Sequence, residues 1–148
     1  MDQSLHIVTL GVADLAASRA FYTDGLGWTP SLDLDEVVFY QVGRGLLLAL
    51  FPLDHLGADA GREATPGTSF SLGQVVGEPA DVAATLDRAR KAGGAVLKDA
   101  QRAAWGGHHG YFADPDGHRW EVAHNPGWTV SPDGTVTIGE IEPDTPTP

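Results

Sequence analysis

The stretch Tyr111-Phe112-Ala113-Asp114-Pro115-Asp116-Gly117-His118-Arg119-Trp120-Glu121 decides the fold of this chain. Its aromatic start is typical of a strand, Asp-Pro-Asp-Gly is typical of a tight turn, and the residues from His118 onward resume a strand. Pro115 presets the backbone angle φ at the first central position of the turn, and Gly117 can leave the turn with little steric cost. The sequence therefore predicts a hairpin whose second strand, otherwise apolar, carries the carboxylate of Glu121.

A short repeat indicates that this hairpin belongs to a duplicated unit. The segment Ala13-Asp14-Leu15-Ala16-Ala17-Ser18 recurs as Ala80-Asp81-Val82-Ala83-Ala84-Thr85. Each copy follows a β-type segment, residues 5–12 or 68–76, and each opens a predicted helix that ends at glycine. Asp14 is the expected N-cap of the first helix, and Pro79 is expected in the first turn of the second.

Three strand-like segments follow each predicted helix, so both halves follow the order β-α-β-β-β. The segments are residues 28–34, 37–42 and 46–51 in the first half, and 95–98, 109–112 and 119–124 in the second. This order predicts an α+β fold in which two tandem modules, residues 5–53 and 67–125, form curved sheets around a cleft with the helices outside. The polar stretch of residues 52–67 is the expected linker.

The two modules form one predicted domain, residues 1–126, and residues 127–148 are predicted to form a small hairpin and a disordered acidic tail. A chain of 148 residues that is 42% hydrophobic can bury one good core. It has no cysteine, which excludes disulfides and thiolate metal sites.

The charge of the chain narrows the class of its partners. With 20 acidic and 9 basic residues the formal net charge is −11, which argues against nucleic-acid binding. The chain shows neither a signal-peptide pattern nor an apolar run long enough to span a membrane. We therefore expect a cytoplasmic protein whose partner is a small molecule rather than a nucleic acid or a membrane.

The aromatic-DPDG-xxx-Glu pattern, together with the paired modules, resembles the vicinal-oxygen-chelate superfamily over about residues 5–126. This superfamily includes glyoxalase I, extradiol dioxygenases, and the fosfomycin- and bleomycin-resistance proteins. The resemblance implies that Glu121 stands where metal-dependent members have a metal ligand. It also implies a homodimer, because members without the metal often bind their ligand near a dimer interface.

The other ligand positions that the resemblance implies hold unsuitable residues. The first falls on Ile7, and His6 is one residue away, so its side chain points to the opposite face of the strand. The second falls in the Thr68–Val76 strand, where Gln74 is the nearest residue of a suitable type, and the strand at residues 46–51 is apolar. A metal cofactor is therefore not favoured, although Gln74, His6 and His109 leave a rebuilt site open.

Strand periodicity also predicts which residues near Glu121 share its face of the sheet. Arg119 shares its face, which leaves two interpretations open: an Arg119–Glu121 ion pair, or a carboxylate that holds a ligand. His124 is expected on the opposite face, and His118, directly after the turn, is expected to be exposed. Trp105 precedes two glycines, which leaves two interpretations open: a flat stacking surface that a ligand can approach, or a residue of the core. The predicted ligand-binding residues are Ile7, Thr9, Phe39, Trp105, Tyr111, Arg119 and Glu121.

Three functions are consistent with these residues. The first is metal-independent binding of a small molecule, aromatic or not, in the cleft. The alternative is a glyoxalase-type lyase or an extradiol dioxygenase that holds a divalent metal with ligands other than those of the family. A third is acid–base catalysis without a metal, with Glu121 as the base. The sequence does not decide whether the protein is an enzyme.

Overall fold

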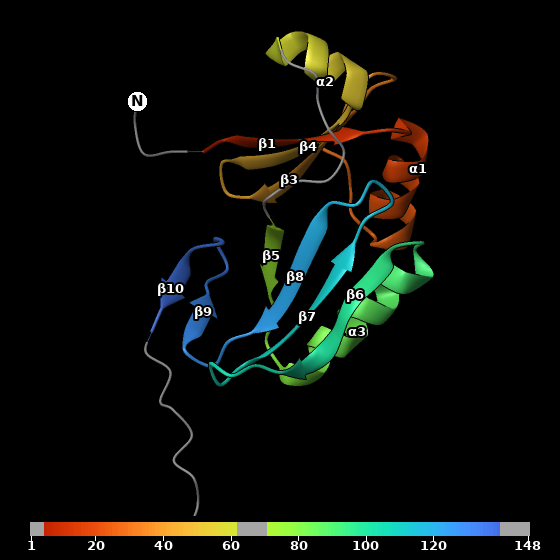
Figure 1. The fold of residues 1–148 in the computed structure, drawn as a ribbon. Helices are drawn as coiled ribbons and strands as arrows, with labels where there is room; N and C mark the ends of the chain where they lie inside the picture. The colour runs from red at the N-terminus through yellow and green to blue at the C-terminus, as the bar shows by residue number, and fades with distance from the viewer. Residues whose placement is uncertain (1–4, 62–70, 140–148) are drawn as a thin grey trace, which may run out of the picture.

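Two four-stranded sheets, arranged in the same strand order, form the body of the protein in this computed structural model, which describes residues 5–61 and 71–139 (Figure 1). The first half comprises β1 (Ile7–Val12), α1 (Leu15–Ala20), the π-helical turn η1 (Phe21–Gly25), β2 (Leu32–Asp33), β3 (Val38–Gly43) and β4 (Leu46–Pro52). The second comprises β5 (Ser71–Val75), α3 (Pro79–Lys91), β6 (Ala95–Arg102), β7 (His108–Ala113) and β8 (Arg119–His124). The predicted α+β fold of paired β-α-β-β-β modules is confirmed.

The matching strand orders, β1-β4-β3-β2 and β5-β8-β7-β6, support a duplication. In each half the first strand pairs in parallel with the last, and the last three strands pair antiparallel to one another. A parallel pair needs a crossover connection, which each half provides with its helix. The helices α1 and α3 lie on the same side of the two sheets (Figure 1).

Both helices begin where the sequence predicts. A side-chain oxygen of Asp14 accepts a hydrogen bond from the backbone N–H of Ala17 at 3.0 Å, which caps α1. In α3, Pro79 occupies the first turn, and Glu78 and Asp81 form a reciprocal capping box. Helix α3 ends at Lys91, and just beyond it Gly93 has a φ of 101°, which favours a residue without a side chain.

One continuous core joins the halves. Val82, Leu86 and Ala89 form the buried stripe of α3, as the helical spacing predicts. Phe21 of the first half packs against Phe112 of the second with ring centroids 6.3 Å apart. Full burial of each large apolar side chain contributes about 1.5–3 kcal/mol, so this shared core holds the two sheets together.

The segment predicted as a linker is not irregular throughout, because it contains the helix α2 (Leu53–Ala60). Leu53 and Leu56 cover Gly11 of β1, where a Cβ atom would come within 2.5 Å of Leu53 Cδ1. The segment is rich in small and acidic residues, so its composition is typical of a linker and does not indicate a helix with two partly buried leucines. As a result, α2 covers one end of the β1 face that also carries Ile7 and Thr9.

The predicted C-terminal hairpin is present as β9 (Trp128–Val130) and β10 (Val136–Ile138), which pair antiparallel. It lies on the side of the second sheet opposite α3 (Figure 1). The predicted strand at residues 28–34 is reduced to Leu32–Asp33, and residues 68–70 and the predicted disordered tail beyond Gly139 lie outside the described residues. Within residues 5–61 and 71–139, no helix is long and apolar enough to cross a membrane.

Candidate functional site: a tryptophan-walled pocket

A pocket of about 380 Å³ lies between the second sheet and the C-terminal hairpin. It is lined by Gly73, Gln74, Val75, Trp105, Glu121, Ala123, Asn125, Trp128 and Val136. Among these described lining residues, Glu121 is the only one with an ionisable side chain. We call this the tryptophan pocket.

Small residues of the sheet leave the space in front of Glu121 open. The parallel register of β5 and β8 places Gly73 directly opposite Glu121, and Ala123 follows on the same face. A Cβ atom on Gly73 would meet no atom within 4 Å. The walls come from outside the sheet: Trp105 lies in the β6–β7 loop, and Trp128 begins the hairpin.

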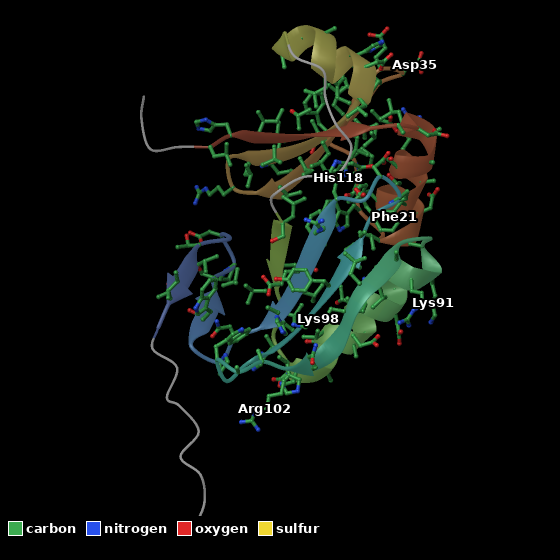
Figure 2. The ribbon with its side chains drawn as sticks, viewed as in Figure 1. Phe21, Asp35, Lys91, Lys98, Arg102 and His118 are labelled. Carbon is green, nitrogen blue, oxygen red and sulfur yellow. The ribbon has the colours of Figure 1, made fainter. Side chains whose placement is uncertain are left out.

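His109 connects the pocket carboxylate to a lysine. Its Nδ1 lies 3.2 Å from Glu121 Oε1, and its Nε2 lies 3.0 Å from Lys98 Nζ, which Figure 2 labels on β6. A lysine ammonium has hydrogen-bond donors but no acceptor, so Nε2 of His109 accepts from Lys98. The hydrogen of the ring is then on Nδ1, and His109 donates it to Glu121.

Tyr111 is the second donor to Glu121, and its position follows from the β7–β8 register, which pairs the two residues across the sheet. Burial raises the pKa of Tyr111, as do its hydrogen bond to Glu121 and the charge of that carboxylate. The ring of His109 lies edge-on between Trp105 and Tyr111, with centroid distances of 5.8 and 5.9 Å. The aromatic rings therefore fix the imidazole that donates to Glu121.

The structure brings together only some of the residues proposed from the sequence. Trp105, Tyr111 and Glu121 lie around His109. Arg119 lies two residues before Glu121 on β8 and is exposed. It is not among the described residues that line the pocket. The remaining three, Ile7, Thr9 and Phe39, lie on the first sheet, where Thr9 and Phe39 flank Ala49 of β4. They do not line the tryptophan pocket.

Two contributors were missed. Trp128 lines the pocket because the hairpin folds over the second sheet, and no local pattern in the sequence predicts that placement. The role of His109 as donor to Glu121 follows from strand periodicity across the hairpin, since residue 109 faces the same side as residues 111 and 121.

A second polar cluster lies at the β7–β8 turn. One ligand atom from each of Asp114, Asp116 and His118 lies within 4.8 Å of the others, so the group could hold a metal ion. The prediction that His118 is exposed is wrong, because only 3% of its surface is accessible. The turn folds back on itself, and the backbone N–H of His118 donates to Asp114 Oδ1 at 2.8 Å.

Hydrogen bonds from the first half already engage these carboxylates. The hydroxyl of Tyr22 donates to Asp114 Oδ2 at 2.7 Å, and the backbone N–H of Ala13 donates to Asp116 Oδ1 at 2.6 Å. The Ser18 hydroxyl donates to the other oxygen of Asp116. We call these contacts the turn clasp, because they fasten the turn of the second half to α1 and η1.

The charge of the turn clasp acts on His118. Burial alone would lower the pKa of His118, but its hydrogen bond to Asp114 and the negative charges of Asp114 and Asp116 outweigh burial and raise it. His118 Nδ1 lies 3.0 Å from Asp114 Oδ2, the oxygen that also accepts the hydrogen bond from Tyr22 of the first half.

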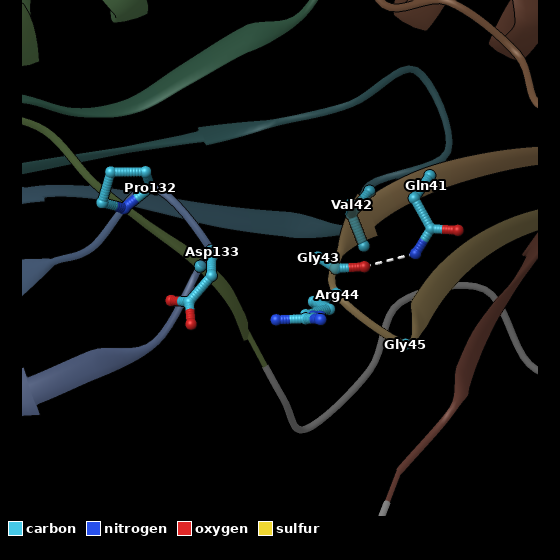
Figure 3. A pocket seen from close by; sticks show the side chains of 8 residues that line it. Gln41, Val42, Gly43, Arg44, Gly45, Pro132 and Asp133 are labelled. Carbon is cyan, nitrogen blue, oxygen red and sulfur yellow. Dashed lines mark hydrogen bonds between the residues drawn. The ribbon is translucent and has the colours of Figure 1, made fainter.

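An open groove separates the C-terminal hairpin from the first sheet. It is lined by the β3–β4 turn, residues 41–45, and by the hairpin turn, residues 132–134. Figure 3 shows the side chain of Arg44 extending toward the side of the groove that carries Asp133. The hairpin therefore spans from the tryptophan pocket to the edge of the first half.

Comparison with known proteins identifies the family. A family model described as the Glyoxalase/Bleomycin resistance protein/Dioxygenase superfamily matches residues 4–122. A glyoxalase-related enzyme from Fulvimarina pelagi is 40% identical, with a TM-score of 0.87 over 93% of this chain and 99% of that chain. A hypothetical protein from S. aureus is 25% identical, with a TM-score of 0.72 over 84% of this chain and 95% of that chain.

A lactoylglutathione lyase from Agrobacterium tumefaciens shares the fold, with 23% identity and a TM-score of 0.65 over 84% of this chain and 95% of that chain. No curated protein matches the chain. The family model spans most of both modules, including the β7–β8 turn and Glu121. The chain therefore belongs to the Glyoxalase/Bleomycin resistance protein/Dioxygenase superfamily.

Proposed function

We propose that the protein binds a small aromatic molecule in the tryptophan pocket without the help of a metal. The observation that carries this proposal is the pair Trp105 and Trp128 on the walls of a largely apolar pocket. Its volume of about 380 Å³ is within the range of small-molecule sites, about 300–1,000 Å³. Stacking on an indole typically adds about 0.5–1.5 kcal/mol beyond the burial of apolar area.

The residues around Glu121 do not fit a divalent metal. Such a site needs three or four donor side chains that converge on one point, but β5 places Gly73 opposite Glu121. His109 Nδ1, which lies 3.2 Å from Glu121 Oε1, carries the hydrogen that it donates to Glu121 and so has no lone pair for a metal ion. In the described part of the chain, the one group of three candidate acidic or histidine ligands is Asp114, Asp116 and His118. That group does not line the pocket.

A second candidate function is proton transfer in the same pocket. It is favoured by the hydrogen-bonded series Glu121, His109 and Lys98, in which a pocket carboxylate is oriented by an imidazole that a lysine orients in turn. Turnover of a bound ligand would distinguish this function from binding alone. The metal-dependent lyase and dioxygenase alternatives would require ligands other than those that the family pattern supplies.

Thermal unfolding of metal-stripped protein tests the proposal. In the presence of EDTA, 3-methylindole and 2-naphthol are expected to raise the melting temperature, because both bind only the folded pocket. Trp128→Ala should reduce this shift. Leu97→Ala, which alters an exposed residue of β6 outside the pocket lining, should leave it unchanged.

Added Zn²⁺, Ni²⁺, Mn²⁺ or Fe²⁺ is expected to leave the melting temperature and the probe affinities unchanged. Two results would contradict the proposal. One is binding of the probes only after metal is restored, and the other is about one tightly bound ion per chain that is lost on Glu121→Gln.

A further inference from the structure

We propose that the tryptophan pocket selects a planar aromatic molecule that carries a protonated amine, with the Glu121 carboxylate as the counter-charge. This inference rests on the proposed function and adds to it the charge of the ligand. Three features support it: the charge of the pocket, the open space in front of Glu121, and the two indole rings.

The pocket presents one negative group and no positive group among its described lining residues. The donors that we identify for Glu121 are uncharged: the imidazole Nδ1–H of His109, and Tyr111, which its raised pKa keeps protonated. Lys98 contacts the far nitrogen of His109 rather than Glu121. Neither of these two donors brings a positive charge to the carboxylate.

The carboxylate has both capacity and space for a ligand. A carboxylate offers about four acceptor positions, and the imidazole of His109 and the hydroxyl of Tyr111 take two of them. Opposite Glu121, Gly73 has no side chain, and a Cβ atom there would meet no atom within 4 Å. The Glu121 side chain is 31% exposed, so an ammonium group can approach it from this open side.

The aromatic walls favour the same charge. The faces of indole rings attract cations, most strongly when the cation is withdrawn from water. Trp105 and Trp128 both line the pocket that holds Glu121. The net charge of −11 extends the attraction beyond the pocket, because it raises the local concentration of cations and repels anions.

Three probes with one ring system separate charge from stacking: tryptamine, 3-methylindole and indole-3-propionate. Isothermal titration calorimetry at pH 7 and low salt is expected to show that tryptamine binds at least about tenfold more tightly than indole-3-propionate, with 3-methylindole between them. High salt should narrow the difference, because ions screen a partly exposed pair.

Glu121→Gln keeps the size of the side chain and removes its charge, so the tryptamine and propionate affinities should come within about threefold of each other. Glu36→Gln is the matched control, because it removes the same charge from an exposed residue away from the pocket. It should preserve the full preference.

The outcomes separate the inference from the proposed function. If none of the three probes binds, aromatic binding in this pocket is wrong. If all bind with equal affinity, or indole-3-propionate binds most tightly, aromatic binding stands and the cation preference is overturned. A tryptamine preference that survives Glu121→Gln also overturns it, because the amine would then be held elsewhere. The comparison of probes on the unaltered protein holds even if a variant does not fold.

Discussion

Trp105 owes its position to a residue that has no side chain. A Cβ atom on Gly107 would lie 1.8 Å from the indole ring, so only glycine allows the ring to fold over the β6–β7 loop. The ring then meets His109 edge-on and still remains 39% exposed. Partial exposure of so large an aromatic side chain is the state expected of a pocket wall rather than of a core residue.

We expect Trp105→Ala to weaken the binding of 3-methylindole by about 1–3 kcal/mol, the usual scale for an aromatic contact at a binding hot spot. The free energy of unfolding should fall by less than the approximately 3–5 kcal/mol that loss of a core tryptophan costs. Calorimetry and urea unfolding measure the two quantities. A severely destabilised variant with unchanged affinity would return Trp105 to the core.

The C-terminal hairpin is an element whose contribution lies in the pocket rather than in the core. No residue from Trp128 to Gly139 is fully buried, yet Trp128 and Val136 line the tryptophan pocket. The hairpin also reaches the β3–β4 turn across the groove that contains Arg44. An element placed in this way should matter more for ligand affinity than for folding.

Truncation after Gly127 tests whether the hairpin contributes to ligand affinity more than to the stability of the fold. The shortened chain should change its free energy of unfolding by less than about 1 kcal/mol, in line with the loss of surface residues alone. Its affinity for 3-methylindole should fall at least about tenfold, because one wall of the pocket is gone. Truncation after Gly139 is the control and should leave both quantities unchanged. A stable shortened chain that binds normally would place the ligand elsewhere.

Sequence patterns predicted the elements better than their assembly. The spacing of Val82, Leu86 and Ala89, and the cap at Asp14, are local properties, and the structure confirms both. His118 is buried beside Asp114, which accepts a hydrogen bond from Tyr22 far earlier in the chain, and local periodicity carries no information about that contact. The location of Trp128 against the second sheet is a tertiary property of the same kind.

At the scale of the whole molecule, the turn clasp makes the free energy of unfolding depend on pH. Because the folded protein holds the pKa of His118 above its usual value, folding favours the protonated ring. The resulting stability is fully present below the unfolded value of about 6.5 and is lost as pH rises through the higher folded pKa.

We therefore expect the urea midpoint to fall as pH rises from 6 through the folded pKa of His118. His118→Gln should flatten this decline, whereas His6→Gln, at an exposed position, should retain it. Unfolding curves recorded at half-unit intervals measure the effect. A midpoint that rises over the same range, or a decline unchanged in His118→Gln, would contradict the assignment.

We propose that two copies of the chain associate as a twofold homodimer. Each sheet has open edges, and Ile7, Val130 and Ile138 are large apolar side chains exposed on β1 and on the hairpin. Light scattering at micromolar concentration should give twice the chain mass of 15.6 kDa. Ile138→Asp should shift the protein toward monomer, and Leu97→Asp on β6 should not. A monomeric wild-type protein would refute the proposal.

The turn clasp also shows that the two halves of the repeat are no longer interchangeable. The carboxylates of Asp114 and Asp116 stand on the turn of the second half, while the corresponding turn of the first half is Gly43-Arg44-Gly45. Their donors Ser18 and Tyr22 lie in the first half, and in the repeat the position of Tyr22 is taken by Ala89, which has no hydroxyl. A tandem fusion of the first half with itself would lack the two carboxylates, and one of the second half with itself would lack the tyrosine hydroxyl. The backbone keeps the symmetry of the repeat, but the complete turn clasp needs residues from both halves.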